Sequence, residues 1–135
     1  MSRLLDNGYC FACGSKNTEG LKLSFTSHGS SVTSVFVLEK RHQGYKDVVH
    51  GGIICTILDE AMVKAGIEAG ASPVTVELTV RFKESLGIGE KAVVEAEVDR
   101  ADSGGRKLIS AKASLRRLSD NKLLAVASSK LLNMT

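Results

Sequence analysis

The residues of this sequence that are best suited to chemistry lie between His50 and Asp59. Two adjacent glycines, Gly51 and Gly52, follow the histidine, and no proline or further glycine occurs until Gly66. This pattern predicts a helix that opens with a glycine turn. A helix start carries free backbone N–H groups and a partial positive charge, and glycines let another molecule approach the backbone closely. The sequence therefore predicts a place that can hold an oxyanion or polarise a carbonyl.

Two turns further along the predicted helix, Asp59 places a carboxylate where the side chains of a core helix should be apolar. Residues three and four positions away share its helix face, and none of them is a cation: Cys55, Thr56, Met62 and Val63. An unpaired acid in such a place costs free energy unless something compensates. Asp59 is therefore the leading functional candidate, and the alternative is an acid satisfied by helix packing or by a distant arginine. Glu60, by contrast, precedes Lys64 by four residues, the favourable order for an ordinary surface ion pair.

The size and composition of the chain limit what it can be. We expect a single domain over residues 1–135, with the apolar and charged fractions of an ordinary globular protein. The net charge of +3 is small and no run of lysine or arginine stands out, which argues against a nucleic-acid partner but suits a small anionic ligand. No stretch of about 20 apolar residues exists, and the N-terminal residues lack the apolar region of a signal peptide. We therefore expect a cytoplasmic protein without membrane contact.

The three cysteines, Cys10, Cys13 and Cys55, argue against a disulfide framework because their number is odd. Cys10-Phe11-Ala12-Cys13 has the spacing of half a zinc site, but a zinc site needs about four ligands and the sequence offers no second pair of this kind. Packing or a tight turn is the favoured account, a metal shared between two chains is the alternative, and we expect no metal or cofactor. Cys55 has no histidine at helical spacing and is interpreted as a core residue rather than a nucleophile.

The remaining pattern of apolar residues predicts one long helix among antiparallel strands. Alternation of apolar and polar residues, with turn residues between the runs, indicates strands over residues 21–25, 32–38, 74–82, 94–98, 109–116 and 123–132, and a loop over residues 39–47. The helix is expected over residues 51–68 and is apolar on nearly every side, which indicates burial. These elements predict an α+β fold in which a curved antiparallel sheet wraps one central helix. The outer edges of such a sheet favour pairing with a second copy of the chain.

The residues around the predicted helix resemble a known family. His50-Gly51-Gly52, with Leu58-Asp59 further along, is similar to the active-site signature of hot-dog-fold thioesterases, most of all the phenylacetic-acid-degradation (PaaI-type) branch of the 4-hydroxybenzoyl-CoA thioesterase superfamily. Further segments along almost the whole chain resemble this branch: Cys10 to Gly14, Gly20 to Leu23, His42 to Tyr45, Thr75 to Phe82, Gly89-Glu90 and Gly105 to Lys107. The chain lacks a proline that the family often has near Leu86, a difference that affects a turn rather than the chemistry.

The resemblance implies a hot-dog fold and the hydrolysis of an acyl-CoA thioester without a metal or cofactor. It makes Asp59 the general base or the nucleophile. The backbone N–H of Gly52, or that of the glycine before it, would polarise the thioester carbonyl. His50 and Gln43 would shape the helix entrance and contact the acyl carbonyl or the leaving group, and Thr75 would position the attacking water.

The same resemblance implies a second set of residues that contact the substrate. Gly51 and Glu60 flank the catalytic positions and are candidate substrate-binding residues. Arg106 and Lys107 could meet the phosphates of CoA, and the alternative for both is a pair of exposed hairpin cations. Among the aromatic residues, Tyr45 and Phe82 are candidates for lining an acyl tunnel, although core packing is the expected use of Phe82.

Helix geometry separates two of the catalytic groups. A helix rises about 1.5 Å per residue, so Gly52 and Asp59 of one helix lie roughly 10 Å apart along the axis. A reacting carbonyl must lie about 3 Å from both its oxyanion donor and its attacking group. One chain cannot supply both, so we predict a homodimer, or a tetramer built from such dimers, in which Gly52 of one subunit meets Asp59 of the other.

Two other functions fit the same scaffold. A non-catalytic acyl-CoA-binding or sensor protein would keep the ligand groove and dispense with the acid, so Asp59 argues against it. A hot-dog hydratase would use a histidine paired with an acid, and His50 has no obvious acid partner in the sequence. An assay for free thiol released from acyl-CoA distinguishes hydrolysis from both alternatives.

Overall fold

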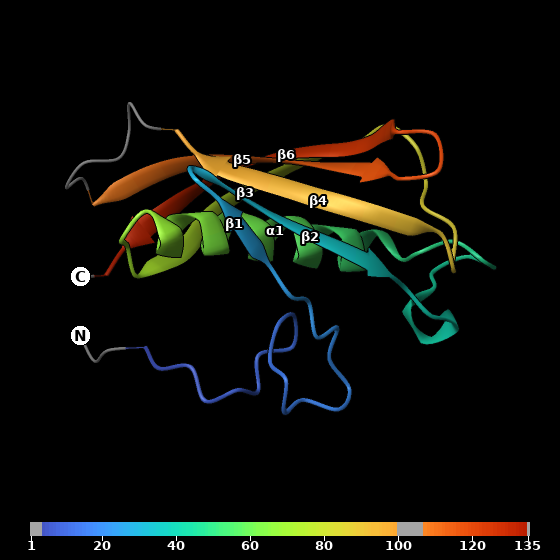
Figure 1. Ribbon diagram of the computed structural model, residues 1–135, viewed down its shortest axis with the longest axis horizontal. Helices are drawn as coiled ribbons and strands as arrows, with labels where there is room; N and C mark the ends of the chain where they lie inside the picture. The colour runs from blue at the N-terminus through green and yellow to red at the C-terminus, as the bar shows by residue number, and fades with distance from the viewer. Residues whose placement is uncertain (1–3, 100–106, 135) are drawn as a thin grey trace.

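One antiparallel sheet of six strands and one long helix make up the regular part of the structure, a computed structural model that describes residues 4–99 and 107–134 (Figure 1). The helix α1 spans Gly51–Glu68, as the sequence predicts. The strands are β1 (Thr26–His28), β2 (Ser31–Val37), β3 (Pro73–Phe82), β4 (Lys91–Val98), β5 (Leu108–Arg117) and β6 (Lys122–Asn133). They lie in the order β1-β2-β4-β5-β6-β3, with every neighbouring pair antiparallel. The predicted α+β fold is confirmed.

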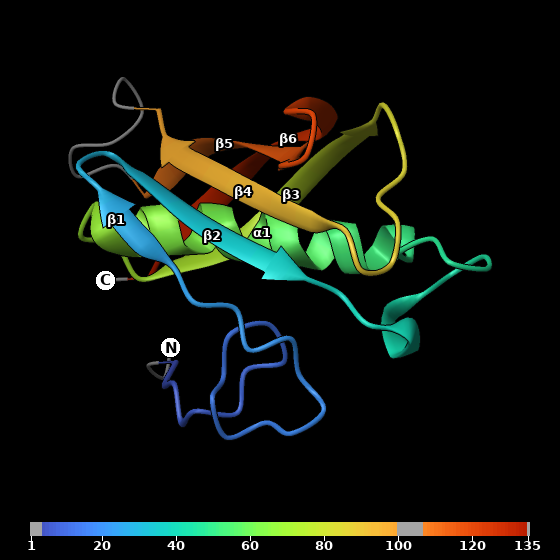
Figure 2. The same cartoon turned by 45° about the vertical axis from the view of Figure 1, so that its right-hand side comes forward.

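The helix packs along one face of the sheet, against β2, β3, β4, β5 and β6 (Figures 1 and 2). Its sheet-facing side chains are buried: Ile54, Ile57, Leu58, Ala61, Met62, Ala65 and Gly66. The opposite flanks stay partly exposed in the single chain, so the expectation of burial on nearly every side holds only toward the sheet. Residues at helical spacing form the apolar stripe that faces the sheet, and the off-stripe positions carry the three acids of α1, Asp59, Glu60 and Glu68. Of the helices within the described residues, none combines the length and apolar character needed to cross a bilayer.

The first predicted strand is wrong in its position. Residues 21–25 are irregular, and the strand β1 begins only at Thr26. Leu21 and Leu23 donate their backbone N–H groups to the carbonyls of Phe11 and Ala12, at 2.8 and 2.9 Å. Lys22 between them has a φ of +52°, a left-handed conformation that breaks an extended strand. The backbone of Leu21 and Leu23 is therefore hydrogen-bonded within the N-terminal segment rather than to a strand of the sheet.

The N-terminal segment, residues 4–25, crosses α1 on the side away from the sheet (Figures 1 and 2). Ala12 and Leu23 of this segment are buried in the same apolar core as the helix. Its turn at residues 11–13 is closed by a hydrogen bond from the Gly14 N–H to the Cys10 carbonyl, at 2.8 Å. The helix therefore lies between two layers, the sheet and this segment.

Strand β3 forms an edge of the sheet because β6 is its one neighbour in the strand order. Its alternating pattern predicts apolar side chains turned inward, yet Val76, Leu78 and Phe82 are 56%, 37% and 52% exposed. The register with β6 shifts between Thr75 and Glu77, the mark of a β-bulge. A long apolar edge is a template for pairing with another chain.

Candidate active site

The start of α1 is capped by the side chain of His50. Its Nδ1 accepts a hydrogen bond from the Gly52 N–H at 2.8 Å, which satisfies one of the free donors of the helix start. A Cβ on Gly52 would lie 3.0 Å from that Nδ1, so any side chain here would press against the capping ring of His50. The Gly51 N–H has no hydrogen-bond partner within the described part of the chain. Gly51 is therefore the glycine whose donor is available to a ligand.

The loop before α1 holds His50 in place. The His50 N–H donates to the carbonyl of His42 at 2.9 Å. The Nδ1 of His42 accepts from the Glu39 N–H at 3.0 Å, while its Nε2 is buried without a partner among the described residues. Burial, followed by the charge of Arg41, lowers the pKa of His42, so the neutral imidazole is favoured. Gln43 contributes to the same loop, because its side-chain oxygen accepts from the Asp47 N–H at 3.2 Å.

Asp59 faces the edge strand β3. The hydroxyl of Thr75 donates a hydrogen bond to Asp59 Oδ1 at 2.6 Å, and both residues are partly buried. The β-bulge that follows Thr75 lies where the strand passes the helix at this pair, and bulges commonly redirect side chains next to active sites. Asp59 has no ion pair within the described residues, so the distant arginine that the sequence left open is not found there. The sequence predicts catalytic roles for both residues but not the hydrogen bond between them.

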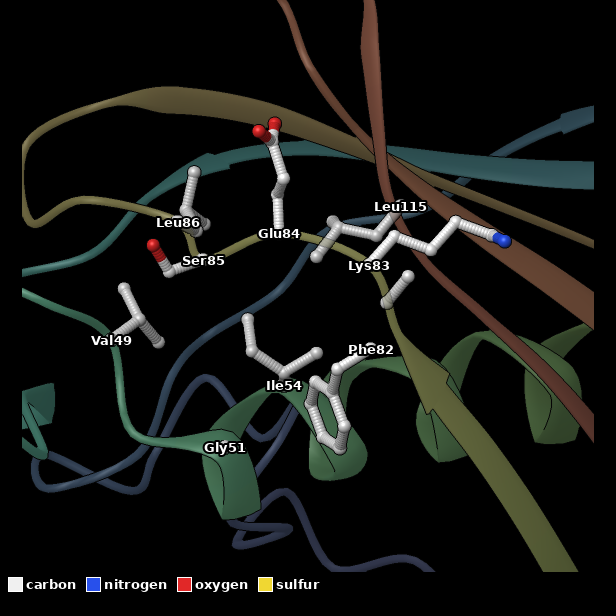
Figure 3. A pocket seen from close by; sticks show the side chains of 10 residues that line it. Val49, Gly51, Ile54, Phe82, Lys83, Glu84, Ser85, Leu86 and Leu115 are labelled. Atoms are coloured by element: carbon white, nitrogen blue, oxygen red, sulfur yellow. The ribbon is translucent and has the colours of Figure 1, made fainter.

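A cavity of about 280 Å³ opens beside the start of α1 (Figure 3). Gly51 and Ile54 of the helix form one wall, and Phe82 with the residues after β3 forms another. Its lining is largely apolar: Val49, Gly51, Ile54, Phe82, Lys83, Glu84, Ser85, Leu86, Leu115 and Ala125. Phe82 lines this cavity and is half exposed, so the expected role in core packing is wrong. The sequence offered no signal for the residues after Phe82, because a loop wall has no periodicity.

Glu60 points to the other flank of α1, toward the N-terminal segment. Its Oε1 lies 4.0 Å from Cys10 Sγ, and its Oε2 lies 3.9 Å from Lys64 Nζ, the ion pair that the spacing predicts. Burial and the neighbouring Glu60 raise the pKa of Cys13 to about 12. Glu60 is thus directed away from the Asp59–Thr75 pair, and the structure gives it cysteine neighbours that the sequence could not reveal.

The proposed phosphate-binding cations lie far along the chain from the helix start. Lys107 precedes β5 and accepts the Asn133 N–H on its carbonyl at 2.6 Å. Its side chain lines a larger hollow of about 1260 Å³ beside the C-terminal half of α1, together with Lys64 and Ile67. Arg106 lies outside the described residues. Within one chain the structure therefore does not bring Lys107 to Gly51.

Comparison with known proteins gives the family. The sequence model of the thioesterase superfamily matches residues 46–123, which cover the end of the loop before α1, the helix, and strands β3, β4 and β5. The chain belongs to the thioesterase superfamily. It is also 33% identical over 92 residues to a "putative esterase" of Archaeoglobus fulgidus, a match that covers 67% of this chain and 56% of that protein.

Solved structures share the fold. A crystal structure of a thioesterase superfamily protein aligns over 93% of this chain and 61% of its own, with a TM-score of 0.84 and 18% identity. The PaaI protein of the Escherichia coli phenylacetic acid degradation operon aligns over 84% of each chain, with a TM-score of 0.74 and 17% identity. A hypothetical thioesterase of Streptococcus pneumoniae, solved with coenzyme A, aligns over 83% of this chain and 88% of its own, with a TM-score of 0.75 and 13% identity. These likenesses confirm the hot-dog fold.

This chain spans a little over half of the curated esterase and 61% of the first of these structures. Membership of the superfamily supports thioester hydrolysis as the general class of reaction.

Proposed function

We propose that the protein hydrolyses an acyl-CoA thioester to the free acid and CoA, at a site shared between two copies of the chain. The observation that carries this proposal is the carboxylate of Asp59, held at 2.6 Å by Thr75 beside an open sheet edge. The free N–H of Gly51 at the mouth of an apolar cavity supplies the complementary group. A carboxylate and an oriented backbone donor are the two parts that thioester hydrolysis needs.

Two chains bring these parts together. Asp59 lies two turns from the helix start, roughly 10 Å along the axis, too far for one carbonyl to meet both groups. A second helix running antiparallel alongside would place its Asp59 near the first chain's Gly51 and Gly52. The exposed apolar residues of β3, Val76 and Leu78, support an interface at that edge. The proposed assembly is a homodimer with two equivalent sites, which can pair again into a tetramer.

The chemistry follows from the positions of these groups. Thr75 holds Oδ1 of Asp59, so Oδ2 is the oxygen that accepts a proton from water. The water oxygen then bonds to the thioester carbon, and the negative charge that develops on the carbonyl oxygen is stabilised by the helix start of the other chain. When the C–S bond breaks, the sulfur of CoA takes the proton from Asp59. Direct attack by the carboxylate would instead give a mixed anhydride, which would place heavy oxygen from water in Asp59 after one turnover.

The helix start has two backbone N–H donors, those of Gly51 and Gly52, and they differ in whether they already have a hydrogen-bond partner. The Gly51 N–H is free and borders the cavity, whereas the Gly52 N–H is bound to His50. Gly51 is therefore the proposed oxyanion donor, and Gly52 can join it only if the His50 ring turns away. In this account His50 caps the helix and sets its entrance, and Gln43 holds the loop that carries it.

The two ends of the substrate fit different surfaces. The cavity of about 280 Å³ beside Gly51 is the proposed site of the acyl group, and its apolar lining suits a short or medium chain or an aromatic acyl group. Lys107 lies near the C-terminal half of α1, so in an antiparallel dimer it would approach the partner's helix start. Lys107 is therefore the proposed contact for the phosphates of CoA, and Arg106, outside the described residues, stays a candidate from the sequence. The coenzyme A bound by the Streptococcus pneumoniae relative supports the same ligand class.

The same relative offers a further parallel. It was solved as two alanine variants, one at an aspartate and one at a threonine sixteen residues later. Asp59 and Thr75 are also separated by sixteen residues. The spacing supports the assignment of this pair as the reacting carboxylate and its positioning hydroxyl.

Subunit complementation tests the shared site. Asp59→Asn removes the carboxylate from one chain, and Gly51→Pro removes the N–H from the other without disturbing the helix, because proline suits the first helical position. The extended conformation of His50 is compatible with a following proline. Each variant homodimer should release thiol from acyl-CoA slowly. A heterodimer purified through two different tags has one intact site of two and should recover about half of the wild-type activity.

Gly51→Ala is the matched control, because it adds a Cβ that meets only Phe82 ring atoms at 3.6 Å and keeps the N–H. It should lose far less activity than Gly51→Pro. Heterodimers as inactive as both parents, or an active monomer in light scattering, would contradict the shared site. A wild-type protein that binds acyl-CoA but releases no thiol would instead identify a non-catalytic binding protein. Hydration of an enoyl-CoA would identify a hydratase, although His50 has no carboxylate bonded to it among the described residues.

A further inference from the structure

A second group of chemically capable side chains lies on the flank of α1 away from Asp59. Cys10, Cys13 and Glu60 each offer one ligand atom, and these three atoms all lie within 4.8 Å of one another. The cysteines come from the N-terminal segment and the acid from α1, so the cluster joins that segment to the helix. All three side chains are partly buried, and both cysteines are free thiols.

The donor set matches a soft divalent cation. Thiolate sulfur, with one oxygen or nitrogen, is the combination that zinc prefers, at about 2.3 Å for sulfur and about 2.0–2.2 Å for a carboxylate oxygen. Ligand atoms around a tetrahedral zinc therefore lie about 3.5–3.8 Å apart. The present separations need to close by about 1 Å or less, which small side-chain rotations achieve. Cys10 Sγ already lies 4.0 Å from Glu60 Oε1.

The backbone around the cysteines is fixed by close packing at Gly14. A Cβ there would lie 2.4 Å from the Cys10 nitrogen and 2.5 Å from the Gly8 carbonyl oxygen, both backbone atoms. Only glycine fits, and the turn it permits directs both sulfurs to the same side, toward Glu60. A Cys-x-x-Cys pair in a tight turn is the usual half of a zinc site. Sequence alone could not supply the third ligand, because Glu60 is 47 positions from Cys13.

Charge and access favour an ion as well. Two thiolates and one carboxylate carry three negative charges, which the two positive charges of zinc and the one of Lys64 balance, since Lys64 lies 3.9 Å from Glu60. The cluster forms part of the wall of the hollow of about 1260 Å³, which gives a path from solvent and room for a water as the fourth ligand.

We propose that Cys10, Cys13 and Glu60 form a zinc site that fastens the N-terminal segment to α1. Binding replaces two thiol protons, which pass to solvent, by two Zn–S bonds, and the carboxylate and a water complete four ligands. The proposal revises the sequence-based expectation of a chain without metal. The role is structural, since the site lies on the flank of the helix opposite to Asp59 and Thr75.

Zinc binding by the full-length protein tests the proposal. The reduced protein, stripped with a chelator, is titrated with zinc chloride against a chromophoric competitor. We expect one zinc per chain in the wild type. Cys13→Ser and Glu60→Gln should each weaken binding by about 100-fold or more, as loss of a ligand requires. Cys55 lies on α1 like Glu60 but outside the cluster, so Cys55→Ser should leave the zinc affinity unchanged.

Two measurements remain informative where a variant does not fold. Cobalt added to the wild type should produce the absorption of a thiolate–cobalt charge transfer, which no carboxylate site gives. Zinc at 100-fold excess over its Kd should raise the melting temperature by about 5–10 °C. Less than a tenth of an equivalent of zinc in the reduced wild type, or an equal loss in Cys55→Ser, would overturn the proposal. A Cys10–Cys13 disulfide that persists in reductant would overturn it as well.

Discussion

Asp59 and Glu60 are consecutive acids on one helix, yet they belong to different environments. Successive residues of a helix point about 100° apart, so Asp59 reaches β3 and Glu60 reaches the N-terminal segment. Asp59 accepts a short hydrogen bond from the neutral hydroxyl of Thr75. Glu60 lies between a lysine and two thiols. The same chemical group thus has a neutral hydroxyl as its partner on one flank and a cation and two thiols as neighbours on the other.

The two flanks of α1 differ in which groups they leave exposed to a second chain. The β3 flank has an exposed apolar edge and a carboxylate without a counterion among the described residues. On the N-terminal flank, residues of the same chain lie against the helix, and the acid there is paired with Lys64. An acid without a counterion beside an exposed sheet edge favours a site shared with a second copy of the chain. A cluster formed by two segments of one chain favours an interaction that holds those segments together. The proposals for hydrolysis and for zinc therefore assign the two acids opposite roles.

Replacing each acid by its amide is the strongest test of this contrast. Asp59→Asn should lower turnover of acyl-CoA by about 100-fold or more, because it removes the proton acceptor while keeping the shape. Its zinc content should match the wild type. Glu60→Gln should lose zinc and show a far smaller loss of turnover. Steady-state thiol release and metal analysis on the same preparations check both.

The reverse result would exchange the two assignments. If Glu60→Gln abolishes hydrolysis and Asp59→Asn does not, the reactive carboxylate lies on the N-terminal flank. Glu68→Gln, an exposed acid at the end of the same helix, controls for the loss of one negative charge.

Thr75 distinguishes a positioned carboxylate from a merely exposed one. Thr75→Val deletes the hydroxyl that holds Asp59 Oδ1 and should lower kcat by about tenfold, the effect of one lost hydrogen bond of about 1.4 kcal/mol. KM should change little, because the hydroxyl acts on the acid rather than on the substrate. Thr75→Ser keeps the donor and should restore most of the rate. Equal kcat values in the valine and serine variants would show that Asp59 needs no such partner.

The sequence identified the β3 flank better than the N-terminal flank, and the reason is physical. The spacing of residues along the predicted helix identified Asp59 as an acid without a partner one turn away, and the paired glycines predicted where the helix begins. The pattern of apolar and turn residues also predicted the bounds of the helix and of five of the six strands to within a few residues. Those features depend on local periodicity, which a sequence displays directly.

Contacts between distant segments escaped the same reasoning. The family resemblance named Thr75 only as a group that positions water, so its hydrogen bond to Asp59 was not predicted. The meeting of Cys13 with Glu60 was missed as well. The strand predicted over residues 21–25 failed because Lys22 adopts a left-handed backbone, a conformation without a sequence signature at a lysine. His50 was placed correctly at the helix entrance, but its capture of the Gly52 N–H follows from a side-chain rotamer.

The smallest expected effect concerns the loop before α1. His42 is buried, and its pKa is lowered from 6.5 by burial first and by Arg41 second, with Glu39 opposing. The unfolded chain therefore binds a proton more readily, so the free energy of unfolding should fall as the pH drops below about 6.5 and level off below the folded pKa. The slope for one group is at most about 1.4 kcal/mol per pH unit. Urea denaturation at several pH values measures it.

His42→Asn provides the comparison, because the asparagine amide oxygen can accept the Glu39 N–H in place of Nδ1 and does not titrate. The variant should lose the extra slope between pH 6.5 and the lowered folded pKa. His42 also accepts the His50 N–H on its carbonyl, so unfolding of this loop would release the helix cap. Acid should then reduce hydrolysis in the wild type more than in His42→Asn, because the loop touches the Gly51 entrance.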